Sequence, residues 1–179
     1  MRLTTARLAL RELARDDLDF VADMLADPAV MQYYPRVLAR TEAEAWIERQ
    51  LGRYRRDGHG LWLVTERATV EPVGQVGLLR QRVADREEWE IGYLLHRRYW
   101  HRGYATEAAL AVRDYAFQKL SQPRVISLIR PENAPSRRVA HRLGMQPTAH
   151  VEFHGFPHLV FARARPLGGP GREGEVSWT

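Results

Sequence analysis

The sequence contains no cysteine, which excludes disulfide bonds, thiolate zinc sites and a cysteine nucleophile. Lysine occurs once, at Lys119, and asparagine once, at Asn133, so the other 26 of the 27 basic residues are arginine. No apolar run approaches the ~20 residues that a membrane helix needs. The first residues also lack the apolar stretch of a signal peptide. We therefore expect a cytoplasmic protein that has no membrane partner.

The composition that is present is ordinary for a globular protein. The chain has 179 residues, of which 45% are hydrophobic and 27% charged, and this length favours one domain. The net charge of +5 is explained by an arginine-rich, GC-rich coding sequence, and the depletion of asparagine is also typical of proteins from high temperature. A basic surface can attract nucleic acid. Because no long arginine run marks a basic tail, however, we do not expect a nucleic-acid partner.

Hydrophobic periodicity predicts strands and helices in alternation. The sequence Thr41–Glu44 has the pattern of a capping box, which predicts that a helix starts there and runs towards Gly58. We expect the hairpin near the end of the chain to turn at Gly155–Pro157. The expected strands cover residues 8–11, 61–65, 72–79, 87–95, 125–129, 148–153 and 159–165, and the other expected helices cover 16–26, 104–119 and 134–143. This order indicates an α/β or α+β domain around a mixed sheet.

The most informative stretch is Trp100–Ala108, which lies between an expected strand and an expected helix. A glycine-containing loop that runs into a helix N-terminus presents unpaired backbone N–H groups and the positive end of the helix dipole, a combination that suits phosphate. Taken alone, Gly103 is equally well explained as an ordinary turn. The spacing differs from the Rossmann pattern G-x-G-x-x-G and from a P-loop, since no Gly-Lys-Ser/Thr follows.

This stretch resembles the acyl-coenzyme A signature of the GNAT superfamily of N-acetyltransferases, Gln/Arg-x-x-Gly-x-Gly/Ala. Gly103 and Ala105 match its last two fixed positions, and Trp100 stands where the general motif has Gln or Arg. The branch of ribosomal-protein alanine N-acetyltransferases commonly has the string Trp-Gly-x-Gly-Tyr-Ala-Thr-Glu-Ala, in which His101 here replaces the first glycine. Further segments of this chain that look like that branch cover residues 5–11, 27–31, 90–93, 130–140 and 142–145.

The resemblance, which extends over roughly residues 4–165, implies a fold and a domain organisation. The implied fold is α/β (α+β), a GNAT-like single domain with a mixed, mostly antiparallel sheet of about seven strands flanked by helices. We assign residues 1–166 to this domain. Residues 167–179 are rich in Gly, Pro and Glu, and we expect them to form a flexible C-terminal tail.

The resemblance also implies an activity, the transfer of an acetyl group from acetyl-CoA, as co-substrate, to a primary amine. The implied catalytic residues are Glu90 as proton acceptor, Tyr93 with its N–H facing the thioester oxygen, and Ser136 as proton donor to the leaving thiolate. From the residues alone, Ser136 is also explained as a first-turn residue. Glu90, with its neighbours Glu87 and Glu88, is also explained as part of a solvated strand edge.

The residues implied to bind coenzyme A lie in three segments of the chain. They are Leu95, the loop residues His101, Arg102, Gly103, Tyr104, Ala105 and Thr106, and Asn133. From the residues alone, Asn133 is a good N-cap for the helix that follows it. Arg97, Arg98 and Arg102 are candidate charge partners for the pyrophosphate.

The histidines show no tight metal spacing, so we expect no metal. No nucleophile–base pair is visible, which favours direct attack by the amine over an acyl-enzyme. The acceptor stays open between a protein N-terminus, an aminoglycoside-like or amino-acid amine, and a polyamine. Its candidate walls are Tyr33, Tyr34, Trp62 and the turn Val151–Leu159, all of which are equally explained as core or interface. An alternative function is a non-catalytic module of the same fold that binds coenzyme A, and weak RNA binding is a third possibility. A homodimer is also possible.

Overall fold

The structure is a computed structural model that describes residues 3–166 and 177–178. Apart from two residues, the expected flexible tail 167–179 lies outside the described residues. The strands are β1 (Leu3–Thr4), β2 (Leu8–Arg11), β3 (Leu61–Glu66), β4 (Pro72–Val83), β5 (Arg86–Leu95), β6 (Arg124–Ile129), β7 (Gln146–Phe153), β8 (Phe156–Ala164) and β9 (Ser177–Trp178). The α-helices are α1 (Leu18–Ala26), α2 (Arg40–Asp57), α3 (Tyr104–Gln118) and α4 (Ala134–Arg142).

The strands form one sheet in the order β7-β8-β6-β5-β4-β3-β2-β1-β9. Every neighbouring pair is antiparallel except β5 and β6, which are parallel. The expected mixed, mostly antiparallel sheet is therefore confirmed. The two strands beyond the expected seven are β1 and β9, which have two residues each and pair with one another.

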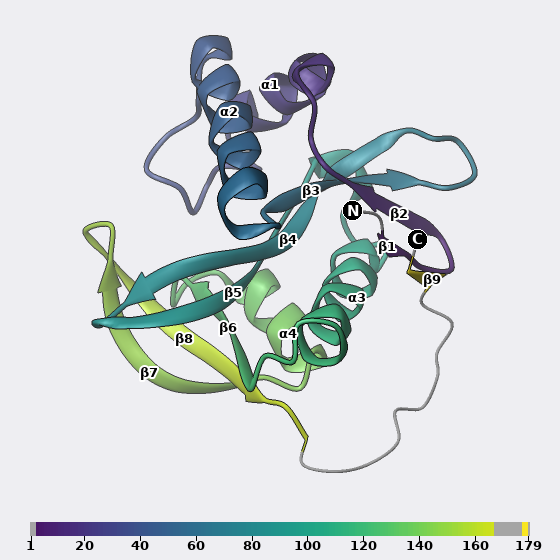
Figure 1. The fold of residues 1–179 in the computed structure, drawn as a ribbon. Coiled ribbons are helices and arrows are strands. Elements are labelled where there is room, and N and C mark those ends of the chain that lie inside the picture. The colour runs from purple at the N-terminus through teal and green to yellow at the C-terminus, as the bar shows by residue number, and fades with distance from the viewer. Residues whose placement is uncertain (1–2, 167–176, 179) are drawn as a thin grey trace.

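The helices cover both faces of the sheet (Figure 1), with α1 and α2 on one face and α3 and α4 on the other. Successive side chains of β3 point to opposite faces of the sheet, so this strand contributes to the core on both sides. Trp62 faces α3, where its ring lies 5.7 Å from that of Tyr115, while Leu63 packs into the cluster under α1 and α2. No helix among the described residues is long and apolar enough to cross a membrane.

Two local expectations were wrong. The first helical residue of α2 is Arg40, because Glu42, rather than Glu44, reaches back to close the first turn and accepts a hydrogen bond from the amide of Ala39 at 2.9 Å. The last hairpin turns at His154 and Gly155, which both have positive φ (52° and 78°), so Phe156 and Pro157 belong to β8.

Candidate active site

The parallel pair β5–β6 is joined at a single position, where Glu90 lies opposite Ile126. On its other edge, β5 pairs with β4 continuously from Arg86 to Leu95. Strand β6 in turn pairs with β8 along its whole length. The two parallel strands therefore diverge after Glu90, and no described strand pairs with residues 91–95 on this edge of β5. We call this unpaired stretch, between β5 and the diverging β6, the opening.

The direction of the backbone groups along β5 follows from its pairing with β4. The amide of His96 donates to the carbonyl of Val73, directly opposite, at 3.0 Å. In an antiparallel pair such hydrogen-bonded positions alternate with positions whose backbone groups point the other way. Residues 92 and 94 therefore point their backbone groups at β4, and residues 91, 93 and 95 point theirs towards the opening.

Two of these outward-pointing carbonyls already accept hydrogen bonds from side chains. The Ser127 hydroxyl donates to the carbonyl of Ile91 at 2.8 Å, and the Trp100 indole N–H donates to the carbonyl of Leu95 at 2.9 Å. The backbone N–H groups of Tyr93 and Leu95 point to the same edge. A linear ligand that enters the opening would thus meet two strand amides in a fixed direction.

Tyr93 and Ser136 are brought together across the opening. The Tyr93 hydroxyl donates to the Ser136 carbonyl at 2.8 Å and lies next to the hydroxyls of Ser127 and Ser136. Loss of hydration raises the pKa of Tyr93, as does the charge of Glu90. Asn133 is the N-cap of α4 and accepts a hydrogen bond from the Ser136 amide at 3.0 Å. The capping explanation of Asn133 is therefore confirmed, and the cap fixes Ser136 at the edge of the opening.

The three carboxylates at the start of β5 have different partners. Glu87 forms an ion pair with Arg80, and Glu88 lies 3.5 Å from Arg124. Glu90 pairs with no arginine of residues 3–166 and accepts a hydrogen bond from the Gln81 amide at 2.8 Å. Among these acids, Glu90 is the one that remains without a cationic partner.

The surroundings of Glu90 favour its protonated form. Loss of hydration raises its pKa, and this effect outweighs the hydrogen bonds from Gln81 and the Leu128 amide and the more distant charge of Arg53. A carboxyl group with a raised pKa beside a reaction site can exchange protons near neutral pH. Its side chain leaves β5 on the face of α1 and α2, opposite to Tyr93.

The loop after β5 enters α3 through two residues in the left-handed region. His101 has a φ of 61° and Gly103, the N-cap of α3, a φ of 79°. A Cβ at Gly103 would find space, so the backbone angle and not crowding favours glycine there. At His101 the positive φ is one that glycine adopts more easily than histidine.

The first turn of α3 offers its backbone N–H groups as an anion site. No side chain caps this turn, and Gly103 uses its carbonyl to accept from the Glu107 amide at 3.0 Å. The amides of Tyr104, Ala105 and Thr106 therefore have no helical partner. The Tyr104 side chain is buried and donates its hydroxyl to Glu66, so it contributes only its backbone to this site.

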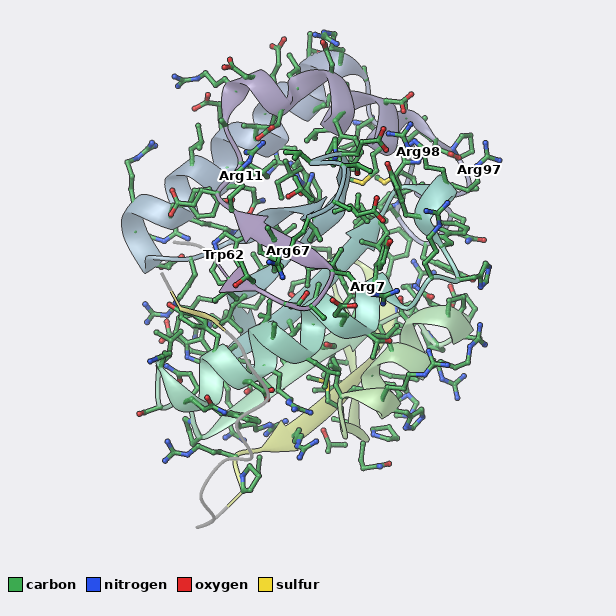
Figure 2. The ribbon with its side chains drawn as sticks, turned by 90° about the vertical axis from the view of Figure 1, so that its right-hand side faces the viewer. Arg7, Arg11, Trp62, Arg67, Arg97 and Arg98 are labelled. Carbon is green, nitrogen blue, oxygen red and sulfur yellow. The ribbon has the colours of Figure 1, made fainter. Side chains whose placement is uncertain are left out.

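The arginines near this turn are not equivalent. Arg97 pairs with Asp27 of the segment after α1 at 3.1 Å. The guanidinium groups of Arg98 and Arg102 lie 5.0 and 5.3 Å from the centre of the Tyr99 ring. Neither has a carboxylate partner among residues 3–166. Figure 2 shows Arg97 and Arg98 side by side near the molecular edge.

The α1–α2 side of the sheet carries a separate pocket of about 250 Å³. Of the two tyrosines named as candidate acceptor walls, Tyr34 lines this pocket and Tyr33 does not. Trp62 is 1% exposed and faces α3, so the core explanation holds for this residue. The other lining residues, which sequence reasoning missed, are Met31, Pro35, Arg36, Leu38, Trp46 and Arg49.

The spacing of Trp46, Arg49 and Arg53, three and then four residues apart, places them on one face of α2 and could have indicated this wall. In the part of the chain that the structure describes, no three His, Asp or Glu residues are grouped so that they could hold a metal ion.

Comparison with known proteins gives a consistent result. Residues 7–146 match the model of the acetyltransferase (GNAT) domain. The Bacillus subtilis (strain 168) protein "Uncharacterized N-acetyltransferase YnaD" is 31% identical over 147 residues, which cover 82% of this chain and 83% of that protein.

Solved structures agree with this similarity. An acetyltransferase from Agrobacterium tumefaciens str. C58 superposes with a TM-score of 0.77 at 32% identity over 91% of this chain and 94% of that one. The ribosomal L7/L12 α-N-protein acetyltransferase RimL, solved in complex with coenzyme A, has the same fold with a TM-score of 0.73 at 16% identity, over 89% of this chain and 95% of that one.

Proposed function

Since the chain belongs to the GNAT acetyltransferases, we propose that it moves an acetyl group from acetyl-CoA to a primary amine by direct attack. The observation that carries this proposal is the opening between β5 and β6. It combines outward-pointing strand amides at Tyr93 and Leu95 with a nearby carboxyl of raised pKa at Glu90. The acceptor class is a protein N-terminus or a small-molecule amine.

The residues that would hold the co-substrate fit its chemistry. The uncapped amides of Tyr104, Ala105 and Thr106 suit the pyrophosphate. Arg98 and Arg102, which form no ion pair among the described residues, add positive charge nearby. His101 and Gly103 shape this turn through their positive φ. The strand amide of Leu95 suits the amide-containing pantetheine arm, and the Asn133 cap sets the facing wall at Ser136. When bound, the thioester supplies the electrophilic carbonyl.

The proton and charge movements can be assigned to residues of this chain. Glu90 accepts the proton that the acceptor amine loses, directly or through water, as the nitrogen bonds to the thioester carbon. The Tyr93 amide donates to the oxyanion that forms, an interaction that typically contributes a few kcal/mol to transition-state stabilisation. The C–S bond then breaks, and Ser136 passes its hydroxyl proton to the departing thiolate. Exchange with solvent returns a proton to the Ser136 oxygen and removes the one that Glu90 took up, so both groups are restored. The products are the N-acetyl amine and the free thiol.

The experiment is a screen of amines and N-terminal peptides for release of free thiol from acetyl-CoA, with mass spectrometry of the product. We expect at least one amine to gain 42 Da, the mass of an acetyl group less a hydrogen, in proportion to the thiol released. Binding of acetyl-CoA without turnover for any amine would contradict the proposal and favour the non-catalytic module. Steeply salt-dependent RNA binding without acetyl-CoA binding would favour the third alternative.

A further inference from the structure

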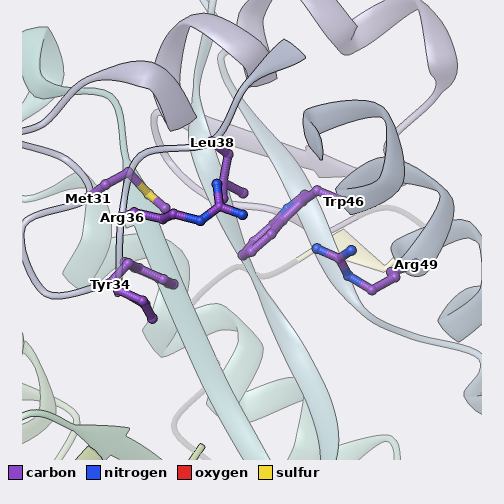
Figure 3. A pocket seen from close by; sticks show the side chains of 7 residues that line it. Met31, Tyr34, Arg36, Leu38, Trp46 and Arg49 are labelled. Atoms are coloured by element: carbon purple, nitrogen blue, oxygen red, sulfur yellow. The ribbon is translucent and has the colours of Figure 1, made fainter. Parts of the chain in front are cut away.

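The pocket between helix α2 and the segment that joins α1 to α2 is lined by side chains of several chemical kinds (Figure 3). Its lining combines apolar and aromatic side chains with two arginines, and Figure 3 shows the Trp46 ring between Arg36 and Arg49. Its volume of about 250 Å³ is slightly below the usual size of a pocket for a drug-sized ligand. The pocket would thus accommodate the side group of a small molecule rather than an extended chain.

The aromatic wall is held in place by the sheet. The Trp46 indole N–H donates to the side-chain oxygen of Gln75 at 2.8 Å, and Gln75 is completely buried opposite Leu94 of β5. The Tyr34 ring lies edge-on to Trp46, with ring centres 6.4 Å apart. The planes of the two rings are inclined at 67°, so together they line an angled aromatic corner of the pocket, of which Trp46 is the anchored side.

The two arginines of the pocket differ in their partners. Arg36 is neutralised by a two-bond ion pair with Glu42. Arg49 lies over the Trp46 ring at 5.5 Å and has no carboxylate partner within the described part of the chain. One cation of the pocket is therefore available to a ligand.

Positive charge accumulates along the same face of α2. Arg53 lies one helical turn after Arg49, and like charges at this spacing repel each other. Loss of hydration lowers the pKa of Arg53, and the charges of Arg49 and Arg56 act in the same direction, whereas the charges of Glu90 and Asp57 oppose them. A bound anion would relieve this repulsion, whereas a second cation would increase it.

The pocket lies on the same side of the sheet as the carboxyl group to which we assign proton transfer. Partial loss of hydration raises the pKa of Tyr34 to about 12, and the charge of Glu90 acts in the same direction. The same Glu90 charge also acts on Arg53. Glu90 and Leu94, which lies opposite Gln75, are four residues apart and therefore on the same face of β5. A molecule whose side group contacts Tyr34 and Trp46 would thus lie on the same side of the sheet as Glu90.

We infer that this pocket selects an amine acceptor that also carries a carboxylate and a flat or apolar side group, as amino acids do, with Arg49 pairing with the carboxylate and Trp46 and Tyr34 contacting the side group. This inference rests on the proposed acetyl transfer and narrows its acceptor. It disfavours polyamines and aminoglycosides, whose additional positive charges would meet Arg49 and Arg53.

The test compares amino acids with their carboxamides, which keep the amine and the side group but lack the negative charge. Two polycationic amines are added as a second comparison. Aromatic and aliphatic amino acids, with L-phenylalanine as the reference, are compared with their carboxamides, with spermidine and with kanamycin in the thiol-release assay. The wild type is compared with Arg49→Gln, Arg49→Lys and, as matched control on another face of α2, Arg55→Gln. The selectivity is the kcat/KM for an amino acid divided by the kcat/KM for its carboxamide. The two amines differ in basicity by the same amount with every variant, so a comparison of this ratio between variants cancels that difference.

We expect Arg49→Gln to raise KM for L-phenylalanine about fivefold and to leave KM for the carboxamide nearly unchanged, as for one partly exposed ion pair. Arg49→Lys should retain part of the selectivity, and Arg55→Gln all of it. Higher salt should weaken the selectivity of the wild type. An unchanged ratio in Arg49→Gln, or a preference of the wild type for spermidine or kanamycin, would overturn the inference.

A second measurement separates this inference from the proposed function. Calorimetry of L-phenylalanine binding to the wild type and to Arg49→Gln, in the presence of free coenzyme A, needs no acetyl transfer. Binding that depends on Arg49 without transfer to any amine would support the pocket assignment and contradict the transferase. Transfer to other amines with no binding of L-phenylalanine would overturn the pocket assignment and leave the transferase intact.

Discussion

Arg7 and Glu107 are 100 residues apart in the chain and form an ion pair beside the first turn of α3, with Nε 2.7 Å and Nη2 2.6 Å from the same carboxylate oxygen. Figure 2 shows Arg7 over the start of this helix. The other oxygen of Glu107 accepts from the Arg7 amide at 2.9 Å and the Thr5 hydroxyl at 2.6 Å. Arg7 also donates to the carbonyl of Arg102 at 3.1 Å. The pair therefore ties the β1–β2 turn to the proposed pyrophosphate turn.

The first prediction concerns the stability that Glu107 provides. Glu107→Gln leaves several donors with one acceptor oxygen in place of two, and we expect a loss of about 1–2 kcal/mol. Glu48→Gln is the matched control, because Glu48 pairs with Arg15 on an exposed surface and its substitution should change the stability far less. Urea unfolding of both variants measures the difference, and equal losses would contradict the assignment.

The contribution of Glu107 should also depend on pH in a defined direction. Burial raises its pKa, but hydrogen bonds from Thr5 and Arg7 outweigh this effect and hold the pKa below its ordinary value of 4.5. A carboxyl group whose pKa is lower in the folded than in the unfolded state stabilises the protein fully at a pH above its unfolded-state pKa. This stabilisation is lost as the pH falls through the folded-state pKa. The stability gap between wild type and Glu107→Gln should be complete at pH 7 and shrink below about pH 4.5. A gap that grows on acidification would show the opposite sign.

A further prediction concerns the backbone turn before α3. Acetyl-CoA should raise the melting temperature of the wild type, because it binds the folded state. Gly103→Glu should abolish this shift, since it places a side chain at positive φ and a negative charge at the anion site. His101→Gly should keep the shift, because glycine adopts a φ of 61° freely. A folded Gly103→Glu protein with an unchanged shift would place the pyrophosphate elsewhere.

The expected outcome for Glu90 is a change in the pH–rate profile. Because its pKa is raised, wild-type turnover should increase with pH through that raised value as the carboxylate forms. Glu90→Gln should lack this limb and lose about 10²-fold at neutral pH, with partial recovery at high pH where the amine deprotonates in solution. Glu88→Gln, which breaks an ion pair with Arg124, is the control. If Glu88→Gln loses turnover and Glu90→Gln does not, the proton acceptor is misassigned.

Ser136 should matter less than Glu90. A thiolate leaves without much assistance, so Ser136→Ala should lower kcat about tenfold while the affinity for acetyl-CoA stays nearly the same. The Asn133 cap binds the backbone amide of Ser136 and not its hydroxyl, so the helix should keep its start. A large loss of acetyl-CoA affinity in Ser136→Ala would indicate a binding role instead of proton donation.

The parts of the fold that were predictable from the sequence are those with local signals. The α3 helix was expected to open near Tyr104 and does so, because Gly103 supplies the left-handed turn. The start of α2 was misplaced because Thr41–Glu44 and Ala39–Glu42 share the same three-residue spacing to a glutamate. The choice between them depends on Arg36, which pairs with Glu42 from outside the helix.

The acceptor side was less predictable for a similar reason. Tyr34 and Trp62 are both aromatic, yet the sheet buries Trp62 against α3 and leaves Tyr34 at the pocket. The sequence could not predict that Arg49, among 26 arginines, has no carboxylate partner in the described part of the chain. The partners of each arginine depend on which carboxylates the fold brings close to it. The opening beside β5 depends on the divergence of β6, a long-range property of the sheet.

The proposed function requires that acetyl-CoA occupies the opening beside β5 and the first turn of α3. Backbone hydrogen exchange resolved by residue, with and without acetyl-CoA, tests this claim directly. We predict slower exchange at the amides of Tyr93, Leu95, Ala105 and Thr106 on binding, and no change in the β7–β8 hairpin. Saturating acetyl-CoA that leaves these four amides unchanged, or protects a different surface, would contradict the account.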